Sequence, residues 1–444
     1  MTKNLTEGKV SKVLIAFALP ILFSTVFQQL YTIADSVIAG KLAGEEALAA
    51  IGASYPVTMI FMAVSLGSNT GCSVIISQLF GAGRMRDMKT AVSTALLTLA
   101  GLSAVLTLFA LVFSPQIMSL MNTPENIFDD ANTYFRIYIG GFAFLSLYNI
   151  SNGVFTALGD SKTPLWFLIF SSVGNVILDL VFVAALGWGV AGAAWATFIT
   201  QGIACVLSVI CVITRISSIR SERFKLFSGK MLLSLAKVSS QTILQQSFVS
   251  VGNMLVQGLV NGYGSAVIAG YSAATKLNVF GVTSLTTVAN AMAAFTAQNV
   301  GARNYERVKR GYRAAVGIIL SIAVVFAAAY SFFGGFFVRM FLENDSSSDA
   351  LKTGVEFLTI VSPFYLAVSI KLVSDSVTRG AGALKLFAIS TFADLIIRVG
   401  LSYALAPAMG ITGIALSWPI GWSIGAIMAY MFYRFGNWRD RQLA

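Results

Sequence analysis

Long apolar runs separated by short polar or charged stretches account for most of this chain. Cuts at clusters of charge, proline and glycine leave twelve runs of about 20 residues or more, the length that an α-helix needs to cross a bilayer. The runs are continuously apolar, whereas the strands of a membrane barrel alternate in pieces of about ten residues. We therefore predict an all-α integral membrane fold with twelve transmembrane helices. The predicted spans are residues 13–38, 53–76, 90–113, 133–157, 164–186, 190–213, 231–260, 266–296, 312–337, 354–378, 384–406 and 411–434.

The second half of the chain repeats landmarks of the first half at a nearly constant spacing of 221 positions. A glutamine near the end of an apolar run, followed by glycine and basic residues, occurs at 78–89 and again at 298–309. The other repeated pairs are Gly159/Gly380, Gly189/Gly410, Gly192/Gly413 and Ala194/Ala415. Two homologous membrane halves are a common plan for transporters, because a site between them can be exposed to either side in turn.

Six spans in each half is an even number, so both halves start on the same side of the membrane. The repeat is therefore predicted to be parallel, with its axis along the membrane normal. We predict two six-helix bundles, residues 1–213 and 231–444, joined by a basic cytoplasmic linker at residues 214–230.

The composition agrees with a membrane protein. Of the 444 residues, 56% are apolar and only 11% are charged, with a mean hydropathy of +0.78. Soluble domains are about 25% charged. The first apolar run has full transmembrane length and no small-residue cleavage site, so we expect a membrane helix there and not a cleaved signal peptide.

The net charge is +11, and the lysines and arginines are divided unequally between the two predicted sides of the membrane. If the N-terminus is cytoplasmic, most lysines and arginines fall in inner segments, and the outer segments hold only Lys41, Arg136, Arg339 and Lys352. By the positive-inside rule, both termini are predicted to be cytoplasmic. The basic excess then serves orientation and contact with anionic lipid heads, and it implies no nucleic-acid partner.

The residue types needed for metal or enzyme chemistry are scarce. The chain has no histidine, and its three cysteines, Cys72, Cys205 and Cys211, all lie in apolar runs. We therefore predict no zinc or haem site and no cofactor. An enzyme would also need a nucleophile with a base and an aqueous domain, so we predict that the protein is not an enzyme. A passive channel is disfavoured because no repeated filter sequence occurs.

Charged residues within apolar runs are candidates for function, since each costs at least about 2.5–3.5 kcal/mol to insert. The charged residues that remain after loops and caps are removed are Asp35, Asp179, Lys276, Lys371, Asp375, Asp394 and Arg398.

In the first half, four polar residues are predicted to share one depth. A helix rises 1.5 Å per residue, so Asp179 lies about 22 Å along its span, with Asn175 one turn away on the same face. Asp35 lies at the outer end of the first span, and Thr197 lies in the descending sixth span at a similar depth. Two carboxylates, an amide and a hydroxyl suit a proton site or a hard-cation site.

In the second half, charges occur as pairs spaced by four residues, Lys371 with Asp375 and Asp394 with Arg398. Internal pairing is the least costly way to keep charges in a membrane, so a structural role is favoured for both pairs. Lys276 has no acid on its own span, and a contact with Asp394 is one option for it. These five residues form a candidate polar network.

Pro20 lies in the middle of the first span, where it removes a backbone hydrogen bond. It could be a hinge that closes the site around Asp35 or a static bend. The 33 Phe, 14 Tyr and 6 Trp residues could line a cavity for flat cationic compounds through stacking and cation–π contacts.

Five motifs, in order along the whole chain, resemble the multidrug and toxic compound extrusion (MATE) family, and its bacterial multidrug branch most. They are Ala34–Gly40, Gln78 with Gly81-Ala82, Gly159–Pro164, Asn175 with Asp179, and Gln298 with Gly301-Ala302. The resemblance implies a V-shaped pair of six-helix bundles in the bacterial inner or plasma membrane. It also implies a monomer that exports organic, often cationic, drug-like compounds in exchange for inward H⁺ or Na⁺.

Part of the family is similar in holding its cation on an Asp of helix one, an Asn and Asp of helix five and a Thr of helix six. These map to Asp35, Asn175, Asp179 and Thr197, and a bound Na⁺ there would be the only metal expected. Other branches rely on an acid in helix seven, and the run 231–260 has none. The choice between H⁺ and Na⁺ stays open, because the same ligands serve both.

A lipid-linked precursor flippase of the same superfamily is the alternative function. Such proteins typically have more spans and a more cationic cavity, whereas the best-supported charges in this chain's first half are two acids.

Overall fold

The computed structural model of the chain describes residues 4–38, 45–121, 123–342 and 348–440, and the side chains of residues 32–38 and 45–49 lie outside this description. The described residues are α-helical, with short 3₁₀ and π segments and no strand. This confirms the predicted fold class.

A helix covers each run that was predicted to span the membrane. The first half contains α1 (Val10–Ile38), α2 (Glu45–Gly81), α3 (Met85–Val112), α4 (Ser114–Leu120), η2 (Glu125–Ile127), α5 (Phe128–Gly140), α6 (Phe142–Ala157), α7 (Lys162–Asp179), η3 (Leu180–Ala185) and α8 (Gly189–Ser218). The second half contains α9 (Gly229–Val260), η4 (Asn261–Tyr263), α10 (Ser265–Gly301), α11 (Tyr305–Arg339), α12 (Ser348–Val361), η5 (Ser362–Phe364), α13 (Tyr365–Gly380), α14 (Leu384–Met409), α15 (Ile411–Phe435) and η6 (Trp438–Asp440).

Among the described residues, nine helical stretches are long and apolar enough to cross a membrane. The other three predicted spans are also helical and correspond to α5 with α6, to α9 and to α14. In α14 the departure from a purely apolar helix comes from Lys385, Asp394 and Arg398. The α5–α6 span is instead divided into two helices of 13 and 16 residues, each shorter than a bilayer crossing requires.

The chain divides into two compact units that do not follow the predicted linker. Unit 1 contains Phe23–Ile243, and unit 2 contains Asn4–Leu22 together with Leu244–Ala444. The chain therefore passes from one unit to the other within α1 and again within α9. The two crossing points, after Leu22 and after Ile243, are 221 positions apart, which is the spacing of the sequence repeat. The predicted division at residues 214–230 follows the repeat along the chain, whereas this division follows packing.

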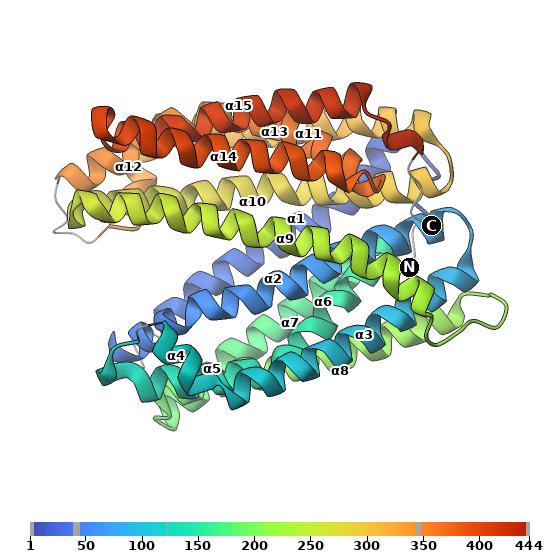
Figure 1. Cartoon of the computed structure of the whole chain (residues 1–444), viewed down its shortest axis with the longest axis horizontal. Coiled ribbons are helices and arrows are strands. Elements are labelled where there is room, and N and C mark those ends of the chain that lie inside the picture. The colour runs from blue at the N-terminus through green and yellow to red at the C-terminus, as the bar shows by residue number, and fades with distance from the viewer. Residues whose placement is uncertain (1–3, 39–44, 122, 343–347, 441–444) are drawn as a thin grey trace. The chain divides into compact units, whose positions relative to one another are not determined.

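Each unit has an aromatic-rich core. In unit 1, the ring of Phe61 on α2 meets Phe142 of α6 edge-on at 5.1 Å between centroids. In unit 2, Trp418 and Trp422 of α15 pack on Phe357 and Tyr365, and α14 runs beside α15 (Figure 1). In a membrane, where lipid tails are as apolar as these side chains, close van der Waals packing of such rings holds the helices together.

A break in regular helix geometry follows the central acid of unit 1. α7 ends at Asp179 and continues as the π-helix η3, and the chain then turns through Gly187 and Gly189, whose φ angles are 67° and 52°. Positive φ is readily adopted by glycine, which has no Cβ. The turn returns the chain as α8 alongside α7, so that Thr197 faces the α7 polar residues. A π segment beside a buried acid is a common feature of functional sites.

Candidate functional site

The most deeply buried acid of unit 1 lies one helical turn from a buried amide. Asp179 and Asn175 on α7 are each 1% exposed. Side chains four residues apart share a helix face, so both point in the same direction from α7. Buried polar groups are kept in proteins where they have hydrogen-bond partners or a function.

Asn175 joins three helices through its side-chain amide. In the orientation that satisfies both ends of the amide, Nδ2 donates to Oδ2 of Asp179 at 2.9 Å and also to the hydroxyl of Tyr31 on α1. The same amide lies 3.4 Å from the Thr197 hydroxyl on α8. The structure thus brings together three of the four predicted residues, Asn175, Asp179 and Thr197.

Tyr31 belongs to this cluster, although the sequence analysis did not select it. The fourth predicted residue, Asp35, lies on α1, but its side chain is outside the described residues. Tyr31 precedes Asp35 by four positions and therefore shares its helix face. That spacing from a membrane-embedded acid was the signal in the sequence that would have found Tyr31.

The cluster presents a carboxylate, an amide and two hydroxyl groups, all of them oxygen ligands or hydrogen-bond partners for a hard cation or a proton carrier. No lysine or arginine occurs in the sequence between Lys162 and Arg215, which covers nearly all of α7 and α8. Between Lys162 and Arg215 these two helices therefore supply acid and neutral polar groups and no lysine or arginine. Among the described residues, no group of three or more His, Cys, Asp or Glu side chains could hold a multivalent metal ion.

An apolar groove adjoins the cluster between α1 and α7. It has a volume of about 300 Å³ and is lined by Phe27, Leu30, Tyr31, Ser172, Val173, Val176 and Ile177. Tyr31 belongs to both features, with its ring in the groove and its hydroxyl on Asn175.

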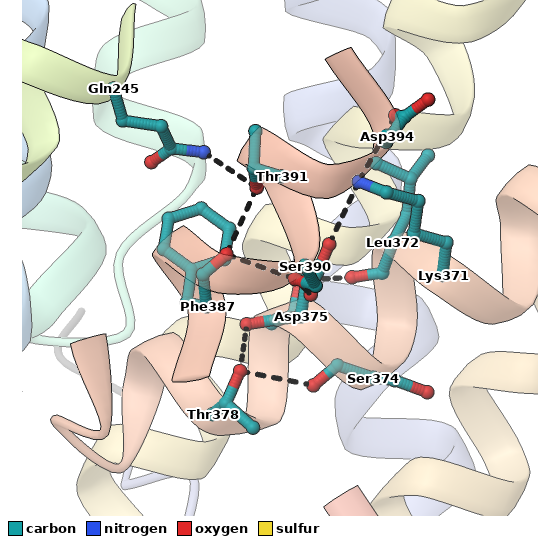
Figure 2. A network of polar contacts seen from close by, with 11 residues as sticks. Gln245, Lys371, Leu372, Ser374, Asp375, Thr378, Phe387, Ser390, Thr391 and Asp394 are labelled. Atoms are coloured by element: carbon teal, nitrogen blue, oxygen red, sulfur yellow. Dashed lines mark hydrogen bonds and ion pairs between the residues drawn. The ribbon is translucent and has the colours of Figure 1, made fainter. Parts of the chain in front are cut away.

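Unit 2 contains a second buried polar network, which Figure 2 shows from close by. Lys371 Nζ on α13 lies 3.0 Å from Oδ2 of Asp375 and 3.6 Å from Oδ2 of Asp394 on α14. Ser390 donates to the other oxygen of Asp375 at 2.6 Å. Gln245 of α9 reaches the same region by donating to the Thr391 hydroxyl at 3.0 Å. Three helices of unit 2 therefore meet through polar side chains.

The remaining second-half candidates do not pair as their spacing predicted. Among the described side chains, no ion pair joins Asp394 to Arg398, because Lys371 takes up Asp394. The Arg398 guanidinium lies 4.3 Å from the ring centroid of Trp418 and donates to Asn253 at 3.0 Å. The option that Lys276 contacts Asp394 is also wrong, since its ammonium lies over the Phe341 ring at 5.9 Å. Stacking on aromatic faces offers these cations an alternative to a carboxylate.

Apolar helices of membrane length, built as a repeat around a buried acid, define a multi-pass membrane protein of the transporter class. The chain belongs to the MatE family of multidrug and toxic compound extrusion transporters, whose model matches residues 20–181 and 242–404. The two matched stretches fall in the two halves of the repeat.

Individual relatives agree with this assignment. The chain is 29% identical over 442 residues to a probable multidrug resistance protein, YpnP, of Bacillus subtilis (strain 168), with 99% of this chain and 98% of the relative covered. It is 24% identical over 327 residues to the multidrug export protein MepA of Staphylococcus aureus (strain NCTC 8325 / PS 47), covering 73% and 71%.

Solved structures have the same fold. An outward-facing multidrug resistance MATE family transporter of the MOP superfamily superposes with a TM-score of 0.90 at 23% identity, covering 98% of each chain.

Proposed function

We propose that this protein is a secondary active antiporter that exports organic, often cationic, drug-like compounds in exchange for inward H⁺ or Na⁺. The observation that carries the proposal is the buried cluster of Asn175, Asp179, Thr197 and Tyr31 in unit 1. Its relatives include proteins named for multidrug resistance and multidrug export, which supports drug-like compounds as the substrate class. Transport proceeds by alternating access of two six-helix bundles.

Asp179 is the central ligand of the coupling ion in this proposal, and Asn175 and Thr197 provide neutral oxygen ligands. Asp35 completes the site, because it follows Tyr31 by one helical turn and Tyr31 already bonds to Asn175. An ion that binds these groups on one side of the membrane and leaves on the other drives export only if the site changes its exposure during the cycle.

Pro20 is the hinge of α1 in this mechanism. The chain passes from unit 2 to unit 1 after Leu22, two residues beyond Pro20. A proline inside a helix removes one backbone hydrogen bond and permits a kink at that point. The part of α1 that carries Tyr31 can then move relative to the part that stays with unit 2.

Transport into inverted membrane vesicles tests the proposed function. Uptake of a fluorescent cationic drug is measured with a pH gradient alone, with a Na⁺ gradient alone and with neither, so that the coupling ion is read directly. We expect one gradient to drive uptake and Asp179→Asn to abolish it. Uptake that needs neither gradient, or that Asp179→Asn leaves unchanged, would falsify this form of coupling.

We also propose that the protein acts as a monomer in the bacterial cell membrane with both termini in the cytoplasm. In intact cells, a single cysteine placed at Asp129 in a cysteine-free background should react with an impermeant maleimide. A cysteine at Arg220 should react only after the cells are permeabilised. Strong labelling at Arg220 in intact cells would reverse the proposed orientation.

A further inference from the structure

Two carboxylates of unit 2 converge on one lysine. Asp375 reaches Lys371 Nζ from the same helix, α13, and Asp394 reaches it from α14 (Figure 2). Lys371 is 5% exposed, Asp375 is 4% exposed and the Asp394 side chain is 13% exposed. Buried carboxylates are unfavourable unless a cation neutralises them, and here that cation is a side chain of the protein.

The neighbouring residues fix the position of the Lys371 ammonium. On α15, Gly425 leaves room for the lysine stem, because a Cβ there would lie 2.8 Å from Lys371 Cε. Gly421 does the same for the carboxylate, since a Cβ there would lie 2.8 Å from Oδ1 of Asp394. Ser390 fixes Asp375 by a hydrogen bond of 2.6 Å. Three helices thus hold both carboxylates in position around one cation.

One oxygen of this arrangement is still available. Oδ1 of Asp394 is buried and has no hydrogen-bond partner among the described residues. Buried polar atoms without partners are rare in native proteins, and each one calls for an explanation. Oδ2 of Asp375 and Oδ2 of Asp394 lie near the Lys371 ammonium. Oδ1 of Asp394 is therefore a third oxygen ligand, which the ammonium does not use.

The other charges near these helices are directed elsewhere. Arg398 of α14 stacks on Trp418, and Arg379 of α13 donates to Asn290 at 2.6 Å. Lys276 of α10 lies over Phe341. Lys371 is therefore the one basic side chain of the described residues within ion-pair distance of these two acids.

We propose that Asp375 and Asp394 form a second cation site, in unit 2, that the tethered ammonium of Lys371 fills permanently. A small monovalent cation such as Na⁺ occupies the site when a neutral residue replaces Lys371. The role of this site in transport rests on the proposed cation-driven export. In the native protein, the Lys371 ammonium stays in this site throughout the cycle, and loading and release of the coupling ion are confined to unit 1.

Equilibrium binding of radioactive Na⁺ to the purified full-length protein tests this site. All variants carry Asp179→Asn, so that the unit 1 site is disabled. Addition of Lys371→Met should create one Na⁺ site in each chain. Further replacement of Asp375 by Asn removes a charged ligand and should weaken this Na⁺ binding by about tenfold or more.

Two variants serve as matched controls. Lys276→Met is the same substitution at another lysine of a membrane helix in unit 2, and it should create no Na⁺ site. Lys371→Arg keeps a cation between the two acids, so it should create none either.

Thermal unfolding provides a second measurement if Lys371→Met is poorly stable. A ligand that binds only the folded state raises the melting temperature, so Na⁺ should stabilise this variant relative to choline at equal ionic strength. The Lys371→Arg protein should melt at the same temperature in both salts. A folded Lys371→Met protein that neither binds Na⁺ nor gains stability from it overturns the proposal. Neither readout requires transport, so failure of the export assay and failure of this site are distinguishable.

Discussion

Unit 1 and unit 2 derive from one repeat but hold their buried acids in opposite ways. In unit 1, Asp179 contacts the Asn175 amide within a stretch, residues 163–214, that contains no lysine or arginine. In unit 2, Asp375 and Asp394 share the Lys371 ammonium. In the proposed mechanism Asp179 exchanges a mobile cation, whereas the two acids of unit 2 share one tethered ammonium. Under the proposed coupling, ion exchange takes place in unit 1, and unit 2 keeps its own cation.

The polar sites lie where the two halves of the repeat differ. The position 221 residues after Asp179 is Gly400, and the one after Thr197 is Trp418. Conversely, the positions that correspond to Asp375 and Asp394 in the first half are Val154 and Val173. The repeat therefore preserves the helices and their crossing points but not the ionisable residues. Similar halves need not perform similar chemistry.

The largest effect is expected at the unit 1 acid. Asp179→Asn keeps the volume and the hydrogen bonding of the side chain but removes its charge, so the coupling ion loses its central ligand. Asp35→Asn should have the same consequence. Both variants should insert and fold normally, yet drug uptake into inverted vesicles against a gradient should fall to background.

The exposed Asp129 on α5 offers a matched control, because Asp129→Asn makes the same chemical change outside the site. This variant should transport like the native protein. If Asp35→Asn and Asp179→Asn both continued to pump drug uphill, coupling through unit 1 would be untenable. Lys276, Asp394 and Arg398 would then be the next residues to test.

The second prediction concerns stability, since unit 2 is expected to respond to charge balance. Lys371→Met leaves two buried carboxylates without their cation, and breaking a buried ion pair in this way costs about 3–5 kcal/mol. In Na⁺-free buffer its melting temperature should drop clearly. The double variant Lys371→Met/Asp375→Leu removes one charge of each sign and leaves one carboxylate, Asp394, without its lysine. Its melting temperature and drug uptake should therefore be closer to native than those of the single variant.

A fully active and stable Lys371→Met protein in Na⁺-free buffer would contradict this account of unit 2. An equal loss of melting temperature in the single and double variants would contradict it as well. The stability would then depend on the packing of the lysine side chain and not on its charge. Lys276→Met should leave the melting temperature nearly unchanged, since the Lys276 ammonium contacts only an aromatic ring among the described residues.

The sequence was sufficient to predict the helices because apolar length is a strong and local signal. It was also sufficient to place Asn175, Asp179 and Thr197 at one depth, since a helix has a fixed rise per residue. The structure brings these three residues into contact, as the depth argument predicted.

Contacts between helices could not be read from spacing in the same way. The i,i+4 rule correctly paired Lys371 with Asp375 but incorrectly paired Asp394 with Arg398, because the rule ignores neighbouring helices. Asp394 lies beside α13 and Trp418 lies beside Arg398, so tertiary contacts decided both partners. The passage of α1 and α9 between units was likewise invisible in the sequence, since no break in composition marks Leu22 or Ile243.

A smaller effect is expected from the neutral ligands of unit 1. Asn175→Ala removes the amide that bonds to Asp179, and Thr197→Ala removes one hydroxyl, but the carboxylates remain. A hydrogen bond to a charged group contributes about 1.5–3 kcal/mol, so the ion concentration for half-maximal transport should rise by about tenfold to a hundredfold. Maximal uptake should persist at saturating ion. Complete loss of uptake in folded Thr197→Ala protein would contradict a supporting role for that residue.

The smallest effect is expected when the same substitution, tyrosine to phenylalanine, is made once in each unit. Tyr31 bonds to Asn175 in unit 1, and Tyr365 donates to Asn278 Oδ1 at 3.0 Å in unit 2. Replacement of either tyrosine by phenylalanine keeps the ring and deletes one hydroxyl, a loss of about 0.5–1.5 kcal/mol.

Tyr31→Phe should raise the ion concentration for half-maximal uptake by about fivefold, because its hydroxyl holds a ligand of the ion. Tyr365→Phe should lower the melting temperature slightly and leave that concentration unchanged, since its partner belongs to the core of unit 2. Titrations of uptake against the coupling ion for both variants decide the matter: an equal shift in the two would mean that unit 2 also takes part in ion loading.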